Sequence, residues 1–230
     1  MAAAACVGLV GAHASADVIA YWNQNSNSLP GGGFGFETTD FPQAADLGAG
    51  SLTLADFDTS ATSGVFDTIQ SFAGTTVNAQ PSVSSGGSLA PQNGSGGVNN
   101  GMSIDLTVST DNFEDIIVSW AQRGTSTGFD SRAFSYSIDG GTNFVLVGTD
   151  SGSLGSSWAT ETYDLSAVTA VDDQSSVIFR ITLDGGSTTS SSGNNRFDNI
   201  TIEGTVIPEP ASLALLAAGL GVAGLRRRSA

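Results

Sequence analysis

Residues 132–147, RAFSYSIDGGTNFVLV, carry the clearest local structural signal in the chain. Phe134, Tyr136 and Ile138 alternate with polar residues, and this period of two is typical of a β-strand with one buried face. Gly140-Gly141 follows, and glycine supplies the positive φ angles that a tight turn requires. The apolar run at the end of the segment predicts a second strand. The whole segment is therefore predicted to be an antiparallel β-hairpin.

The same alternation occurs in other segments, namely 103–108, 116–120, 177–183 and 199–203. Each segment places apolar side chains on one face and polar side chains on the other, as antiparallel strands with a solvent-exposed face do. Residues 82–101 and 185–195 are dominated by Ser, Gly, Thr and Asn, and they are predicted to be long loops. We predict one all-β domain over residues 17–205, with the architecture of an antiparallel jelly-roll-like β-sandwich.

The composition agrees with an extracellular β-domain that is rich in turns. Hydrophobic residues make up 40% of the 230-residue chain and charged residues only 13%, and there are 30 Gly. The seven basic residues are all Arg, and three of them form the C-terminal run Arg226, Arg227 and Arg228, so four remain within residues 17–207. Glu209 is the one acid outside that range, which leaves 21 of the 22 acids inside it. Such a surface repels nucleic acid, which we exclude as a partner.

The residues that are missing exclude several chemistries. Cys6 and His13 are the only Cys and His, both lie near the N-terminus, and the chain has no Lys. A Ser-His-Asp triad, a thiol nucleophile, a Schiff-base lysine and a conventional zinc site are therefore excluded from residues 17–205. The domain also has no disulfide, so packing, hydrogen bonds or a bound ion must stabilise it.

The N-terminus is predicted to be a signal peptide spanning residues 1–16. A run of small and apolar residues is followed by Ala14-Ser15-Ala16, which fits the small-x-small rule of signal peptidase. Cleavage is expected after Ala16, which makes signal peptidase a partner. The alternative is an N-terminal hydrophobic strand.

The C-terminus is predicted to contain a single transmembrane helix. Residues 211–225 are uncharged and mostly apolar, and Arg226, Arg227 and Arg228 follow at once. As a helix the segment is about 22 Å long, and the arginines should stay on the cytoplasmic side of the membrane. A buried C-terminal helix is the alternative, but the segment has no polar face and ends in three charges.

Pro208, Glu209 and Pro210 stand directly before the apolar segment. Two prolines around one carboxylate keep the chain extended and accessible. With the apolar run and the Arg cluster, residues 206–230 resemble the PEP-CTERM sorting signal of Gram-negative and related bacteria. The resemblance implies recognition by an exosortase, a membrane-embedded Cys protease-transpeptidase. It also implies export, transient anchoring in the membrane and a final location at the cell surface or outside the cell.

Residues 104–204 resemble the jelly-roll domains found ahead of this sorting signal and, more distantly, carbohydrate-binding and laminin-G-like sandwiches. The segments that carry the resemblance are 116–120, 132–141, 177–181 and 196–204. In many such lectin-like sandwiches a calcium ion joins a carboxylate near the first strand to an Asp that opens the last strand. The resemblance implies Glu37 and Asp198 for these positions, and hard carboxylate oxygens suit calcium. The alternatives are that Asp198 caps a turn and that Glu37 is an exposed strand charge.

Trp22 and Trp158 are predicted to be exposed rings that stack on sugars, because each stands beside a polar residue. The sequence thus indicates an exported cell-surface or matrix protein that is structural or adhesive, is not an enzyme, and has extracellular polysaccharide as its candidate ligand. One alternative is a carboxylate-based glycoside hydrolase, since that mechanism needs only two carboxylates. A second alternative is a calcium-dependent adhesion module without sugar specificity.

Overall fold

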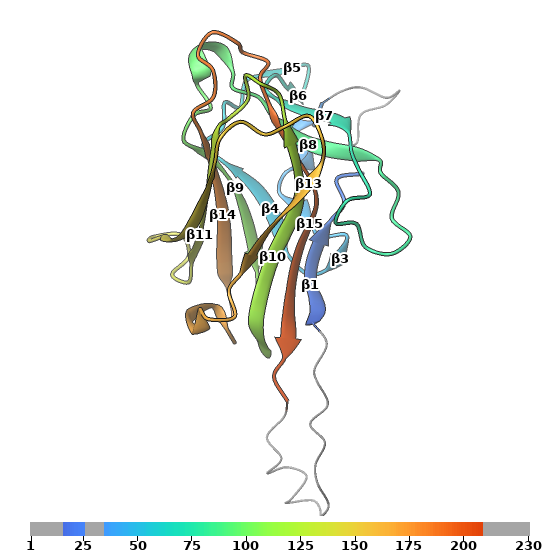
Figure 1. Cartoon of the computed structure of the whole chain (residues 1–230), viewed down its shortest axis with the longest axis vertical. Helices are drawn as coiled ribbons and strands as arrows, with labels where there is room; N and C mark the ends of the chain where they lie inside the picture. The colour runs from blue at the N-terminus through green and yellow to red at the C-terminus, as the bar shows by residue number, and fades with distance from the viewer. Residues whose placement is uncertain (1–15, 26–34, 209–230) are drawn as a thin grey trace, which may run out of the picture.

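The structure is a computed structural model that describes residues 16–25 and 35–208. Two antiparallel sheets pack face to face (Figure 1). The strands of the seven-stranded sheet run in the order β13-β10-β15-β1-β3, with β8 paired to β15 and β7 paired to β8. Their bounds are β1 Ala16–Trp22, β3 Leu47–Gly48, β7 Ile69–Ala73, β8 Gly87–Pro91, β10 Phe113–Gly124, β13 Ala159–Asp164 and β15 Asn195–Val206.

The six-stranded sheet has the order β12-β11-β14-β9-β4-β2. Its strands are β2 Gln43–Ala44, β4 Ser51–Ala55, β9 Met102–Val108, β11 Ser131–Ser137, β12 Val145–Ser151 and β14 Val177–Asp184. A small separate pair joins β5 (Ala61–Thr62) to β6 (Val65–Phe66), and three single 3₁₀ turns complete the fold: η1 Thr38–Asp40, η2 Ser95–Gly97 and η3 Thr169–Val171. The predicted all-β sandwich is confirmed.

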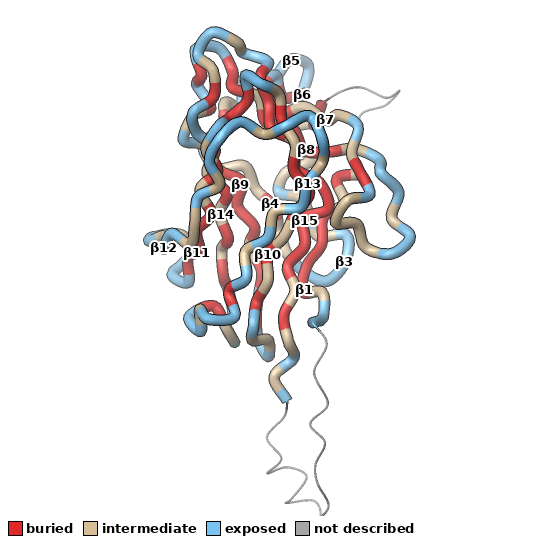
Figure 2. The backbone as a smooth tube through the Cα atoms, viewed as in Figure 1, coloured by how far each residue is buried: buried red, intermediate tan, exposed pale blue. Residues whose placement is uncertain are grey.

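The core lies between the two sheets, and it is formed by the apolar faces that the alternation predicts. Ile104 and Leu106 of β9, Val118 of β10, and Phe179 and Ile181 of β14 are all completely buried. Figure 2 shows buried residues along the strands of both sheets, with exposed residues concentrated in the loops. The predicted hairpin is also present, because β11 pairs with β12 and places Tyr136 opposite Val145.

One predicted loop contains a strand. Residues 82–101 include β8, in which Ser88, Leu89 and Ala90 are all completely buried. Successive side chains of a strand point to opposite faces, so the burial of all three shows that both faces of β8 are covered. Its residues therefore show no alternation of apolar and polar types. The other predicted loop has no strand between Asp184 and Asn195.

The two ends of the described domain emerge together. Ala16, at the start of β1, pairs with Thr205 near the end of β15, so both strands reach the same end of the sandwich (Figure 1). Ala14, most of the predicted signal peptide, and residues 209–230 lie outside the described residues. Within 16–25 and 35–208, no helix is long and apolar enough to cross a membrane; the predicted transmembrane segment 211–225 falls beyond that range.

Candidate functional site

The outer face of the seven-stranded sheet carries the most ligand-like group of side chains. Along β13, Glu161 and Tyr163 point into the sandwich, so the alternating residues Thr160 and Thr162 point outward, and both are exposed. Trp158 lies two residues before Thr160, just ahead of β13, so its side chain is on the same outer face. The ring is half-buried. This face therefore presents an aromatic ring in line with two hydroxyl groups.

Two arginines continue this row across the sheet. Arg123 of β10 lies directly opposite Arg196 of β15 in the strand register. The Arg123 guanidinium carbon lies 5.8 Å from the centre of the Trp158 ring, and that of Arg196 lies 4.3 Å from the centre of the Phe72 ring. Each guanidinium thus has an aromatic ring beside it, a favourable cation–π arrangement. We call Trp158, Arg123, Arg196 and Phe72 the arginine–aromatic row.

The two arginines of the row have few polar partners. The Nε of Arg196 donates to Oδ1 of Asn194 at 3.3 Å. The Nε of Arg123 is buried and finds no hydrogen-bond acceptor among residues 16–25 and 35–208. Burial, together with the neighbouring Arg123 guanidinium, lowers the pKa of Arg196. Positive charge is therefore concentrated here with little local compensation.

The prediction of an exposed Trp22 is wrong. Its side chain is completely buried in the core cluster, and its Nε1 donates to the carbonyl of Gln43 at 3.2 Å. The ring cannot stack on a ligand, because it packs among the buried residues of the core. Trp158 is the tryptophan of the predicted pair that stays accessible.

The two carboxylates predicted to bind calcium lie in different settings. Glu37 directly precedes η1 and bridges to Val65. Asp198 is completely buried in β15, where its Oδ2 accepts the Thr75 N–H at 2.7 Å and its Oδ1 accepts the Asn199 N–H at 2.8 Å. Burial raises the pKa of Asp198 to about 7. No group of three or more His, Cys, Asp or Glu suited to a metal occurs in the described part of the chain, so the calcium pair stays a prediction.

A second polar cluster lies between the sheets, where β12 and β13 form their edges. The Arg132 side chain is 1% exposed and its Nε donates to Oδ2 of Asp150 at 2.9 Å. The Nε2 of Gln122 donates to the same Asp150 oxygen at 2.8 Å and lies 3.4 Å from Oε2 of Glu161. One amide thus bridges two carboxylates, and Tyr163 lies beside them.

The environment separates the pKa values of these two carboxylates. Burial, with the charge of Asp150 adding to it, raises the pKa of Glu161. Burial acts in the same direction on Asp150, but hydrogen bonds from Arg132 and Gln122 outweigh it and lower the pKa of Asp150. A carboxylate pair with divergent pKa values is a feature of acid–base sites and also of structural ion networks.

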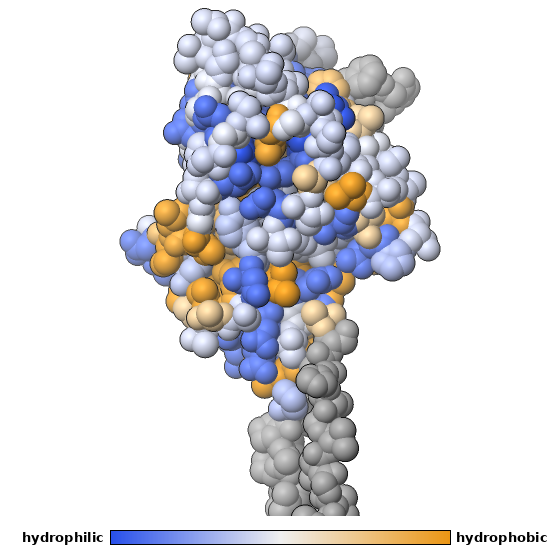
Figure 3. All heavy atoms as spheres, in the orientation of Figure 1, coloured by the Kyte–Doolittle hydropathy of each residue, from blue (hydrophilic) through white to orange (hydrophobic). Residues whose placement is uncertain are grey.

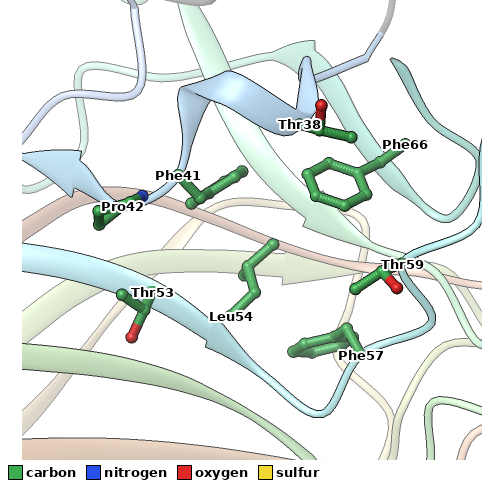
Figure 4. Close-up of a pocket in the computed structure, with 8 residues that line it drawn as sticks. All are labelled: Thr38, Phe41, Pro42, Thr53, Leu54, Phe57, Thr59 and Phe66. Carbon is green, nitrogen blue, oxygen red and sulfur yellow. The ribbon is translucent and has the colours of Figure 1, made fainter. Parts of the chain in front are cut away.

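Two apolar features lie elsewhere on the domain. Figure 4 shows Phe41, Phe57 and Phe66 around Leu54 in a hollow of about 230 Å³, which is smaller than the roughly 300–1,000 Å³ of ordinary small-molecule sites. Figure 3 shows hydrophobic residues gathered at the left of the molecule, over the β11–β12 hairpin. The exposed hydrophobic residues of that hairpin are Ile138, Val145 and Leu146. Thr38, Thr53 and Thr59 also line the small hollow, whereas the exposed residues of the hairpin patch are apolar.

The comparisons with known proteins add a sorting motif and a set of folds. Residues 206–228 match the PEP-CTERM protein-sorting motif. This motif implies export, membrane anchoring before cleavage, and processing by an exosortase. Of the residues predicted for sorting, Pro208 is described, whereas Glu209, Pro210, Arg226, Arg227 and Arg228 lie outside the described range. The search of curated proteins finds no match to the chain.

Several solved structures share the sandwich architecture. The chain is similar to the CBM22-1 xylan-binding domain of Xyn10C from Paenibacillus barcinonensis, with 13% identity, coverage of 86% of this chain and 100% of that one, and a TM-score of 0.44. For TmCBM61 in complex with β-1,4-galactotriose the identity is 9%, the coverage 77% and 97%, and the TM-score 0.41. For the K1 cleaved adhesin domain of Lys-gingipain from Porphyromonas gingivalis these values are 12%, 67% and 90%, and 0.43. These likenesses concern the fold alone.

Sequence reasoning found Trp158 but missed the other members of the row. Arg123, Arg196 and Phe72 lie far apart in the sequence, and only the pairing of β10, β15, β8 and β7 brings them together. The one available signal was the scarcity of positive charge, because only four arginines occur in residues 17–207. Their pairing with acids or with each other depends on strand register, which the sequence does not specify.

Proposed function

We propose that this chain is an exported surface or extracellular-matrix protein whose sandwich domain binds polysaccharide on the outer face of the seven-stranded sheet. The observation that carries the proposal is the half-buried Trp158 ring beside the exposed Thr160 and Thr162. An aromatic face offers a sugar ring an apolar contact, and hydroxyl groups beside it supply donors and acceptors. The sorting motif supports a location where polysaccharide is available.

The orientation of Trp158 supports a ready-made contact surface. Its ring lies against the Arg123 guanidinium, which restricts the motion of both side chains. A ring that is already held in place loses little conformational entropy when a ligand binds. The arrangement favours recognition of the flat faces of successive sugars by contact and not by enclosure.

The test is a glycan-binding assay on the full chain in mild detergent. Trp158→Ala should weaken binding to the glycans that the parent retains by about tenfold, a loss typical of a buried aromatic contact. Phe144→Ala is the matched control, because Phe144 also lies under a guanidinium, that of Arg180 at 3.8 Å, but on the other sheet. Retention of glycans that is equal in the parent and in Trp158→Ala would contradict the proposal.

Glycoside hydrolysis is a second candidate, favoured by the carboxylate pair that Gln122 bridges. In such an enzyme Glu161, with its raised pKa, would be the acid and Asp150 the base or nucleophile. Release of reducing ends from the retained glycans by the parent, and its loss in Glu161→Gln, would support hydrolysis. Binding without release of reducing ends would leave the pair as a structural network that joins β12 to β10 and β13.

A further inference from the structure

The two arginines of the arginine–aromatic row lie side by side in a strongly acidic protein. We propose that Arg123 and Arg196 bind the carboxylate groups of an acidic polysaccharide, a polymer of uronic acids. The inference rests on the proposed function, because it uses the same face of the sheet, and it names the class of glycan. It is carried by the charge balance and by the geometry of the row.

The charge balance singles out these two arginines. Of the four arginines in residues 17–207, Arg132 is ion-paired with Asp150 at 2.9 Å and Arg180 with Asp105 at 2.7 Å. Arg123 and Arg196 have no ion pair among the described residues, although these include 21 of the 22 acids. Residues 26–34, SNSLPGGGF, contain no acid. Two arginines without a carboxylate partner are unexpected in a domain where acids outnumber arginines so strongly.

The acid nearest to them in the register is already engaged. Asp198 lies two positions after Arg196 on β15, opposite Ala121. Both of its oxygens accept backbone N–H groups, from Thr75 and Asn199, and the side chain is completely buried. Burial favours its neutral form by raising its pKa to about 7. Asp198 is therefore only partly ionised at neutral pH, and its oxygens are engaged by the backbone, so it compensates the two arginines weakly.

The geometry of the row leaves hydrogen-bond donors available to a ligand. Adjacent strands lie about 4.8 Å apart, so Arg123 and Arg196 are neighbours on one face, where like charges destabilise each other. The rings of Trp158 and Phe72 hold the guanidinium groups, and the Nε of Arg123 has no acceptor in the described residues. A carboxylate placed between the two groups would accept charge-assisted hydrogen bonds from both and remove their repulsion.

The neighbours of the arginines narrow the ligand class to sugars that carry a carboxylate. The Trp158 face and the hydroxyl groups of Thr160 and Thr162 suit pyranose rings, whereas the two arginines suit a planar anion. The net charge of −15 disfavours duplex nucleic acid, which carries one negative charge per about 1.7 Å of its axis. A uronate polymer combines sugar ring faces, which suit Trp158, with one carboxylate on each sugar, which suits the two arginines.

The experiment compares two probes with the same sugar backbone, polygalacturonate and its methyl ester, in which methylation removes the negative charge of the carboxylate. The full chain in mild detergent should bind the acid at least about tenfold more tightly than the ester, the effect expected from one or two charge-assisted contacts. Arg123→Gln and Arg196→Gln should each abolish this preference while changing binding to the ester less than about threefold. Arg180→Gln is the matched control, because it removes the same charge from the other sheet.

The outcomes separate this inference from the proposed function. Equal affinity of the parent for acid and ester would overturn the inference, whereas glycan retention that depends on Trp158 would still support the proposed function. Equal weakening by Arg180→Gln and by the two row variants would also overturn it, because net charge alone would then explain binding. Thermal unfolding checks that each variant folds, and the comparison of acid and ester on the parent tests the inference even if a variant does not.

Discussion

Asp198 is a carboxyl group whose protonation should control stability. In the folded protein burial raises its pKa to about 7, whereas an unfolded chain ionises an aspartate near pH 4. The stability gained from the protonated form is therefore complete below about pH 4 and is lost as the pH rises to about 7. Asp198→Asn does not titrate, so its unfolding free energy should fall less over this interval, by an amount on the order of a few kcal/mol.

The measurement is denaturant unfolding of parent and Asp198→Asn at pH 4 and pH 8. The difference between the two pH profiles matters more than the absolute stability of the variant, because an amide places an NH₂ group against one of the backbone N–H donors of Thr75 and Asn199. Parallel profiles would show that Asp198 ionises normally in the folded protein.

The two tryptophans show how far the sequence predicts single residues. Trp22 and Trp158 both stand beside polar residues, yet the first is buried and the second is accessible. The decisive difference is the face on which each ring lies, because Trp22 packs into the core between the sheets whereas Trp158 lies on the outer face with Thr160 and Thr162. The chemistry of adjacent residues in the sequence does not contain this information.

At the scale of elements, β3 should depend on its glycine. Gly48 and Gly140 both have positive φ, +70° and +72°, so replacing either with Ala introduces a similar backbone strain of roughly 1–2 kcal/mol. A β-carbon at Gly140 meets no atom within 4 Å, whereas one at Gly48 would collide with the carbonyl of Ile19 in β1. Gly48→Ala should therefore lower the unfolding free energy by at least about 1 kcal/mol more than Gly140→Ala.

Chemical denaturation of the two variants beside the parent measures this difference. If Gly48→Ala and Gly140→Ala are equally stable, the contact between β3 and β1 is loose enough to adjust, and the short β3 strand contributes little to the sheet.

The sequence predicts the strands that have one solvent-exposed face or that are followed by a glycine turn. β9, β11, β14 and the middle of β10 alternate visibly, and the glycines mark the turn between β11 and β12. The sequence predicts a loop where β8 lies, because Ser88, Leu89 and Ala90 are buried on both faces of the strand and show no alternation. Apolar and polar residues alternate along a strand only when one face is buried and the other faces solvent. The pattern is therefore absent where both faces are covered, and it does not predict such a strand.

At the scale of the whole molecule, the arginine–aromatic row and the sorting motif lie at opposite ends of β15. This strand ends at Val206, where the motif begins, whereas Arg196 stands near its start. Ten residues of strand span about 33 Å. The row therefore lies far from the end of the sandwich that continues into the sorting motif, and it would remain accessible to polysaccharide while the tail holds the protein at a membrane.

The last prediction concerns that tail, whose processing should depend on Glu209. From the sequence, the prolines on either side are expected to restrict φ and keep Glu209 out of a helix, in an extended segment next to residues 211–225. In the described structure Ile207 still donates its backbone N–H to Asn112 at 2.9 Å, so Pro208 follows immediately after the folded domain. Glu209→Ala leaves this contact, the prolines and the apolar segment unchanged. We therefore expect normal export and folding but a block in processing, with full-length protein accumulating in the membrane fraction.

Replacing the three terminal arginines should instead impair topology and retention, because those charges keep the segment from sliding outward through the lipid. Fractionation into membrane, surface and medium, with an epitope inserted in the exposed turn at 82–85 ahead of β8, distinguishes the two variants. Processing and release of Glu209→Ala at the parent's level would mean that the carboxylate is not read, and that the tail acts as an ordinary anchor.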